Sequence, residues 1–144
     1  MEVTQSKLNT VIRIKDILLK RHQKELADIR TEKDQATGTL KDLEDTREQA
    51  YADAASSTRT KARDAQINEA FINNLSHQIR HQEKKVGEMG IAEENKRDEV
   101  KGVSQSKRML EELEERRQTE VDKEVERKAQ RLIDVLAQRM NTNK

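Results

Sequence analysis

The chain contains no cysteine and no proline, and its only aromatic residues are Tyr51 and Phe71. Without cysteine it can form no disulfide framework and perform no thiol chemistry. Without proline, nothing forces a helix to break. Only 32% of the residues are hydrophobic, so there is little material for a three-dimensional core. A length of 144 residues would suit one globular domain, but this composition argues against it.

Two further absences concern membranes and nucleic acids. No apolar run approaches the roughly 20 residues that a membrane-spanning helix needs, so we expect no direct membrane insertion. The N-terminus also lacks the apolar core of a signal peptide. The 29 basic and 28 acidic residues are interleaved and leave a net charge of +1. Such a balance gives no strong field for anionic lipid or nucleic acid, which disfavours a nucleic-acid adaptor.

Catalytic motifs are missing as well. The sequence has no glycine loop that could cradle a phosphate and no nucleophile with a nearby base. His77 and His81 lie one helical turn apart, a spacing that could hold a divalent metal ion. Only Asp45, which a hairpin would place opposite His77, offers a further ligand. We therefore interpret the histidines as solvated helix residues and expect no enzyme, no cofactor and no metal.

Charged residues make up 40% of the chain, and Glu, Lys, Arg, Gln, Ala and Leu dominate it. These residues favour helix, and the composition is typical of long helices or coiled coils. Disorder is the alternative for so polar a chain, unless its apolar residues are periodic. They are periodic: a heptad seam runs through the first half at Leu8, Ile12, Lys15, Leu19, His22, Leu26, Ile29, Lys33, Ala36, Leu40, Leu43, Arg47, Ala50 and Ala54.

A second seam occupies the second half, at Ile72, Leu75, Ile79, Gln82, Val86, Met89, Glu93, Lys96, Val100, Val103, Lys107, Leu110 and Glu114. The two seams match when the chain folds back so that opposed residue numbers add up to about 122. This fold places the turn in the Ser/Thr-rich stretch ASSTRTKARD. The sequence thus predicts an all-α fold, a single antiparallel two-helix coiled-coil hairpin over residues 1–144.

In this hairpin, helix one covers about residues 4–55, the turn about 56–63 and helix two about 64–140. Thr60 or Asp64 is the candidate N-cap of helix two. A break at Gly87–Gly90, giving three helices, is an alternative, since glycine weakens a helix by about 1 kcal/mol relative to alanine. The heptad seam runs through this site in phase, which favours a local bend.

Helix two is longer than helix one, which predicts a C-terminal helical overhang of about 25 residues. The overhang carries an apolar stripe at Val121, Val125, Ala129, Leu132, Leu136 and Met140. Such a stripe needs a partner, either another copy or a different protein, unless it is a set of ordinary surface aliphatics. The N-terminal arm is apolar on more than one face, so the end that carries both termini is expected to be enclosed.

Three segments resemble one family. The stretch FINNLSHQI at residues 71–79 resembles the Phe-Ile-x-x-Leu-x-x-x-Ile start of the second helix in the flagellar export protein family FliJ and its virulence type III secretion counterparts. RKAQRLIDVLAQR, near the C-terminus, is similar to the closing pattern of that family. LNTVIRIKDILLKRHQKEL, near the N-terminus, is similar to its opening arm.

The resemblance implies a non-enzymatic stalk similar to the central stalk of rotary ATPases. It would be cytoplasmic and peripherally associated with the inner-membrane export apparatus. Its two-terminus end would enter the hexameric export ATPase, its other end would touch the export-gate membrane protein, and it would escort export chaperones. The expected ATPase contacts are Leu8, Val11, Ile12, Leu18, Val125, Leu132, Leu136, Gln138 and Arg139.

The expected gate contacts are Tyr51, Phe71 and Leu75. In the matched register Tyr51 and Phe71 lie level, one step off their seams, on opposite sides and partly exposed. They either bind a partner or plug the tip of the hairpin. We expect a stalk to be monomeric when alone. The alternative function is a self-associating structural coiled-coil scaffold, whose overhangs pair between copies.

Overall fold

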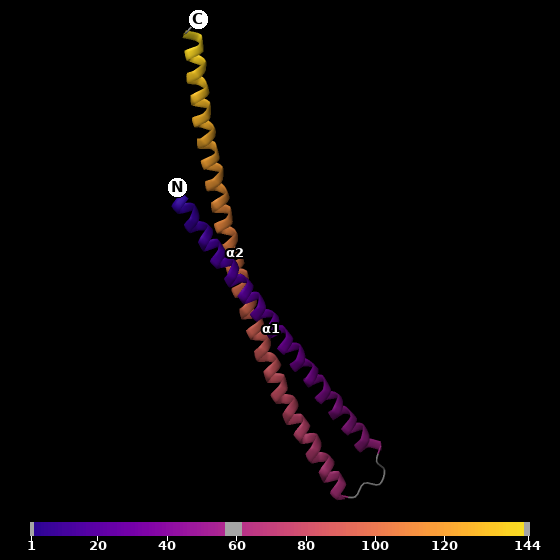
Figure 1. The fold of residues 1–144 in the computed structure, drawn as a ribbon. Helices are drawn as coiled ribbons and strands as arrows, with labels where there is room; N and C mark the ends of the chain where they lie inside the picture. The colour runs from indigo at the N-terminus through magenta and orange to yellow at the C-terminus, as the bar shows by residue number, and fades with distance from the viewer. Residues whose placement is uncertain (1, 57–61, 143–144) are drawn as a thin grey trace. The chain divides into compact units, whose positions relative to one another are not determined.

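The computed structural model describes residues 2–56 and 62–142, with side chains from Lys7 onward. It contains two α-helices, α1 from Glu2 to Ser56 and α2 from Ala62 to Thr142 (Figure 1). The two helices pack against each other, which confirms the prediction of an all-α helical hairpin. The centre of the expected turn and Thr60 lie outside the described residues.

Helix α2 is continuous over its 81 residues and passes through Gly87, Gly90 and Gly102 without interruption. No described residue has a positive φ, so these glycines adopt ordinary helical geometry. The alternative with three helices, separated at Gly87–Gly90, is therefore wrong. Asp64 lies within the first turn of α2 and so is not its N-cap. An acidic side chain there still favours the helix by interacting with its dipole.

The hairpin consists of two compact units. The central unit is formed by Arg21–Val100, and the terminal unit by the segments Met1–Lys20 and Lys101–Lys144, of which residues 2–20 and 101–142 are described. Each unit contains one segment of α1 beside one segment of α2. The described residues with fully buried hydrophobic side chains all belong to the central unit: Leu26, Ala36, Leu75 and Ile79.

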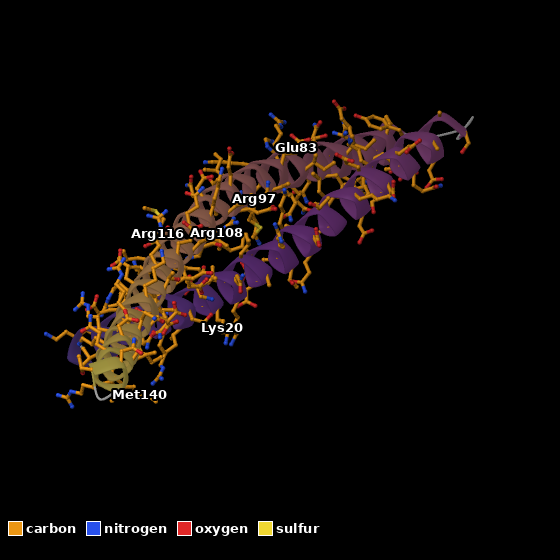
Figure 2. All side chains as sticks on the ribbon, turned by 90° about the horizontal axis from the view of Figure 1, so that it is seen from above. Lys20, Glu83, Arg97, Arg108, Arg116 and Met140 are labelled. Atoms are coloured by element: carbon orange, nitrogen blue, oxygen red, sulfur yellow. The ribbon has the colours of Figure 1, made fainter. Side chains whose placement is uncertain are left out.

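The interface between the helices follows the seams that the sequence predicts. Each predicted position from Leu8 to Ala50 in α1 and from Ile72 to Glu114 in α2 is buried or half-buried. Only Ala54, at the end of the first seam, is exposed. Ile79 is the most enclosed side chain, with 2% of its surface exposed. Two helices can cover only one narrow stripe on each other, so most other side chains face solvent, and Figure 2 shows their nitrogen and oxygen tips along both helices.

Ion pairs between the helices set the register within each unit. In the terminal unit, Lys107 Nζ lies 2.8 Å from Asp16 Oδ1. In the central unit, Arg30 Nε lies 3.4 Å from Glu93 Oε1. Both pairs lie within one residue of the predicted register. An interhelical hydrogen bond from the Gln82 side chain to the backbone carbonyl of Ala36, 3.0 Å long, joins positions one helical turn away from that register.

Three charged seam positions, Glu93, Lys96 and Lys107, have partners of opposite charge on the other helix. Glu93 accepts hydrogen bonds from Lys33 on α1, at 3.0 Å, and from Arg97 on its own helix, at 3.1 Å. Lys96 lies between Glu25 and Glu99. The hydrogen bond from Lys33 is the main reason why the pKa of Glu93 lies below its ordinary value. The hydrogen bond with Glu25 is the main reason why the pKa of Lys96 is raised.

These shifts predict how stability depends on pH. Because the pKa of Glu93 is lower in the folded chain than its ordinary value of 4.5, its stabilising contribution is complete above that pH and is lost as pH falls through the folded-state value. Glu93→Gln should therefore lower the thermal unfolding midpoint at pH 7, and the gap to the unchanged chain should narrow below about pH 4. Circular dichroism melts from pH 7 to about pH 3 measure this gap.

Glu94→Gln is the matched control, since Glu94 is the exposed neighbour of Glu93. It should change the midpoint little at any pH. A gap between Glu93→Gln and the unchanged chain that stays constant over the whole pH range would show that the ionised carboxylate does not stabilise the seam.

Candidate interaction surfaces

The terminal unit exposes most of the large hydrophobic side chains of the described chain. Eleven of the fifteen that are exposed belong to this unit: Val11, Ile14, Ile17, Met109, Leu113, Val125, Leu132, Ile133, Val135, Leu136 and Met140. None of its described side chains is fully buried. The unit thus combines little core with much exposed apolar surface, a combination that marks an interaction site.

The overhang accounts for six of these eleven residues. All described residues of α2 from Val125 onward are exposed, and Leu132 has 63% of its surface accessible. Figure 1 shows this part of α2, in yellow, continuing past the start of α1. Ile133 and Val135 widen the stripe that the sequence analysis found. A spacing of three or four residues along one stripe leaves these two residues out. The distribution of hydrophobic residues around the whole helix includes them.

The overhang is also basic beyond Glu126. From Arg127 to Thr142 it contains three arginines and one lysine in addition to Asp134, its only acidic residue. Gln138 and Arg139, which the family resemblance assigns to a partner contact, are exposed here. The overhang therefore offers an apolar stripe accompanied by positive charge.

The N-terminal arm presents a second apolar surface. Leu8, Ile12 and Leu18 are half-buried, whereas Val11, Ile14 and Ile17 are exposed. Of the four expected ATPase contacts on this arm, Leu8 and Ile12 belong to the seam with α2, Leu18 is half-buried next to a seam residue, and Val11 is exposed. The structure brings all nine of the expected contacts of this kind into the terminal unit.

The expected gate contacts belong to the central unit and differ in exposure. Tyr51 and Phe71 have 54% and 48% of their surfaces exposed, whereas Leu75 has only 5%. Leu75 packs in the seam, so a direct contact with a partner is open to the two aromatic residues and not to Leu75. Its buried position instead holds the adjacent part of α2 against α1.

Tyr51 and Phe71 line two different shallow grooves. Phe71 lies with Asp45, Gln49 and Asp53 of α1. Tyr51 lies in a groove with a separate set of residues, including Ala65, Glu69 and Ile72 of α2. Asn68 is shared by both grooves. The aromatic side chains therefore flank the seam on opposite sides, as the heptad positions predict, and offer two separate contact points.

The described residues contain no group of three His, Cys, Asp or Glu side chains placed to hold a metal ion. His77 and His81 instead line a groove with Thr39, Leu43 and Gln82. In the same described part of the chain, neither helix has a stretch long and apolar enough to cross a membrane.

Comparison with known families gives one clear result. The model of the family described as "Flagellar FliJ protein" matches residues 4–144, nearly the whole chain. No curated protein and no solved structure matches the chain significantly.

The exposure of Leu75, Tyr51 and Phe71 predicts how much each side chain contributes to the stability of the folded chain. Leu75→Ala should lower the free energy of unfolding by about 2–3 kcal/mol, because it removes a buried side chain from the seam. Tyr51→Ala and Phe71→Ala, made one at a time, should each lower it by about 1 kcal/mol, because both side chains keep about half their surface in water. Urea denaturation followed by circular dichroism measures these values. A larger loss for either aromatic residue than for Leu75 would mean that the aromatic side chains plug the tip.

Proposed function

The chain belongs to the FliJ family of flagellar proteins, and on this premise we propose that it is the stalk that couples the export ATPase to the export gate. As a member of this family it is a non-enzymatic component of the flagellar export apparatus, associated with the export ATPase and the apparatus in general. The proposal adds which part of the chain meets which partner. It also places the protein in the cytoplasm, peripherally at the inner-membrane apparatus.

The terminal unit is proposed to enter the hexameric ATPase ring. One observation carries this assignment: the buried hydrophobic residues all lie in the central unit, whereas most exposed ones lie in the terminal unit. A surrounding ring would cover apolar surface on several sides of the unit at once, which a single flat partner could not do. The contacts we propose are Leu8, Val11, Ile12, Leu18, Val125, Leu132, Leu136, Gln138 and Arg139.

The end of the hairpin next to the turn is proposed to contact the export-gate membrane protein through Tyr51 and Phe71. Aromatic residues are enriched at protein–protein interfaces. Tyrosine is also among the residue types that often contribute most of the binding energy. Leu75 supports this contact from the seam. Escort of export chaperones is part of the same proposal, and its support is the family alone.

The overhang stripe gives the direct test of ring insertion. Burying an aliphatic side chain contributes about 1.5–3 kcal/mol, so Leu132→Ser with Leu136→Ser should weaken binding to the cognate export ATPase by about 100-fold or more. Stimulation of ATP hydrolysis and ring assembly should fall with it. The denaturation midpoint of the isolated chain should barely change, because both side chains are exposed.

Ile91→Ser is the matched control, since Ile91 is an exposed aliphatic residue of the central unit. It should leave ATPase stimulation unchanged. A steep fall in the midpoint of the overhang variant would contradict the proposal, because the stripe would then pack against its own chain. Light scattering covers the scaffold alternative: a chain that dimerises alone, and becomes monomeric in the overhang variant, is a self-associating coiled coil.

The aromatic pair tests the gate contact separately. Tyr51→Ala with Phe71→Ala should weaken binding to the gate protein at least tenfold, roughly 1.4 kcal/mol, while helicity and ATPase stimulation persist. Surface plasmon resonance with the detergent-solubilised gate protein measures the affinity. If gate binding survives both changes, or if the overhang variant loses it equally, the contact lies elsewhere on the chain.

A further inference from the structure

One side of the terminal unit is apolar on both helices, in the part where α1 and α2 run side by side. We call it the two-helix face. Its members are Val11, Ile14, Leu18, Met109 and Leu113. Met109 has 70% of its surface exposed and Leu113 47%. Met109 and Leu113 belong neither to the overhang nor to the apolar surface of the N-terminal arm.

The ion pairs of the same unit establish which positions share a side. Lys107 Nζ lies 2.8 Å from Asp16 of α1 and 3.6 Å from Glu111 of α2. Asp16 directly follows the seam residue Lys15, and Glu111 directly follows Leu110. Positions that follow these seam residues on the two helices therefore lie on one common side of the pair.

The two-helix face lies on the other side. Val11 directly precedes a seam residue, as does Leu113 on the opposite helix, and Leu18 repeats Val11 one heptad later. In an antiparallel pair of helices, the positions just before every second seam residue lie on one side of the seam on both helices. The positions just after the intervening seam residues lie on the other side. The central unit confirms this directly, because Glu25 and Glu99 occupy the equivalent positions there and both contact Lys96. Ile14 lies three residues from Val11, and Met109 lies four residues from Leu113, so both extend the face outward.

The contrast between the units indicates what the face does. On the equivalent side of the central unit, the corresponding positions Glu25 and Glu99 are charged and both pair with Lys96, whereas Phe71 is an exposed aromatic residue there. A third apolar position per heptad, beside the two of the seam, is typical of a helix that packs against more than one neighbour. The two helices therefore present an apolar face of the kind that packs against a third helix.

The charge at the rim of the face selects among possible helices. Lys7 on α1 and Arg116 on α2 border it, and both are exposed. The described residues include no ion-pair partner for the Arg116 guanidinium. A second copy of this chain that used the same face would bring the same cations to the contact, which disfavours it. A helix with an acidic flank would instead pair with them.

We propose that the two-helix face receives an amphipathic α-helix with an acidic flank, supplied by the ATPase ring, so that a three-helix bundle forms inside the ring. This inference rests on the proposed insertion into that ring and names the chemistry of the partner element. It separates the contact of the two-helix face from that of the overhang.

Met109→Ser with Leu113→Ser tests the apolar part of the face. The double change should weaken binding of the full chain to the purified export ATPase at least tenfold, measured by isothermal titration calorimetry. Ile91→Ser is the control for an exposed aliphatic residue elsewhere. The thermal midpoint of the isolated chain should remain nearly unchanged, because both replaced side chains are largely exposed.

Arg116→Glu tests the charge and stays informative even if the serine variant unfolds. It should weaken ATPase binding about tenfold and reduce the dependence of affinity on salt, because it removes an attractive pair from the interface. Arg108→Glu is the matched control, since Arg108 is an exposed arginine of the same helix that directly follows the seam residue Lys107, whereas the face is formed by positions that precede seam residues. It should retain normal binding.

The overhang variant distinguishes failure of this inference from failure of the proposed function. If Leu132→Ser with Leu136→Ser abolishes ATPase binding but the changes at Met109, Leu113 and Arg116 do not, ring insertion stands and the two-helix face has no helix to bind. If neither set weakens binding, both proposals are wrong. A chain that dimerises alone through Met109 and Leu113 would make the face a contact between copies and overturn the inference.

Discussion

Two helices that pair in water can cover only one narrow stripe on each other, and this constraint governs the rest of the molecule. The stripe here is mixed: Ile79 and Leu75 are buried in it, while Glu93, Lys96 and Lys107 lie in the same row and meet charges from the opposite helix. Buried apolar side chains supply most of the stabilisation, and the ion pairs select one register, since a shifted pairing would leave half-buried charges without partners.

Under this constraint, the two units of the chain differ in how much apolar surface they leave exposed. The central unit buries hydrophobic side chains, and most of what it leaves outside is polar. The terminal unit exposes aliphatic surface on the overhang, on the N-terminal arm and on the two-helix face. An isolated helix gains nothing from an apolar stripe that faces water. This surplus of apolar surface is the basis for the proposed contact with the export ATPase.

The two kinds of candidate contact also differ physically. Near the turn, Tyr51 and Phe71 are single aromatic residues on opposite sides of the seam, each in its own shallow groove. They suit a contact of small area that depends on a few side chains. In the terminal unit the apolar surface is extended and bordered by basic residues such as Arg116 and Arg139. It suits a partner that encloses the helices, with charge guiding the approach.

The sequence by itself determined the helices, the seams and their register, because heptad spacing and the absence of proline depend only on the order of residues. It also found most of the overhang stripe, since Leu132 and Leu136 follow a simple period. Only the tertiary structure decided how far Tyr51 and Phe71 are exposed, at 54% and 48% of their surfaces, and that Ile14, Met109 and Leu113 contribute to one face. Those outcomes depend on which sides of two distant segments come together, and a pattern read along one chain does not contain that relation.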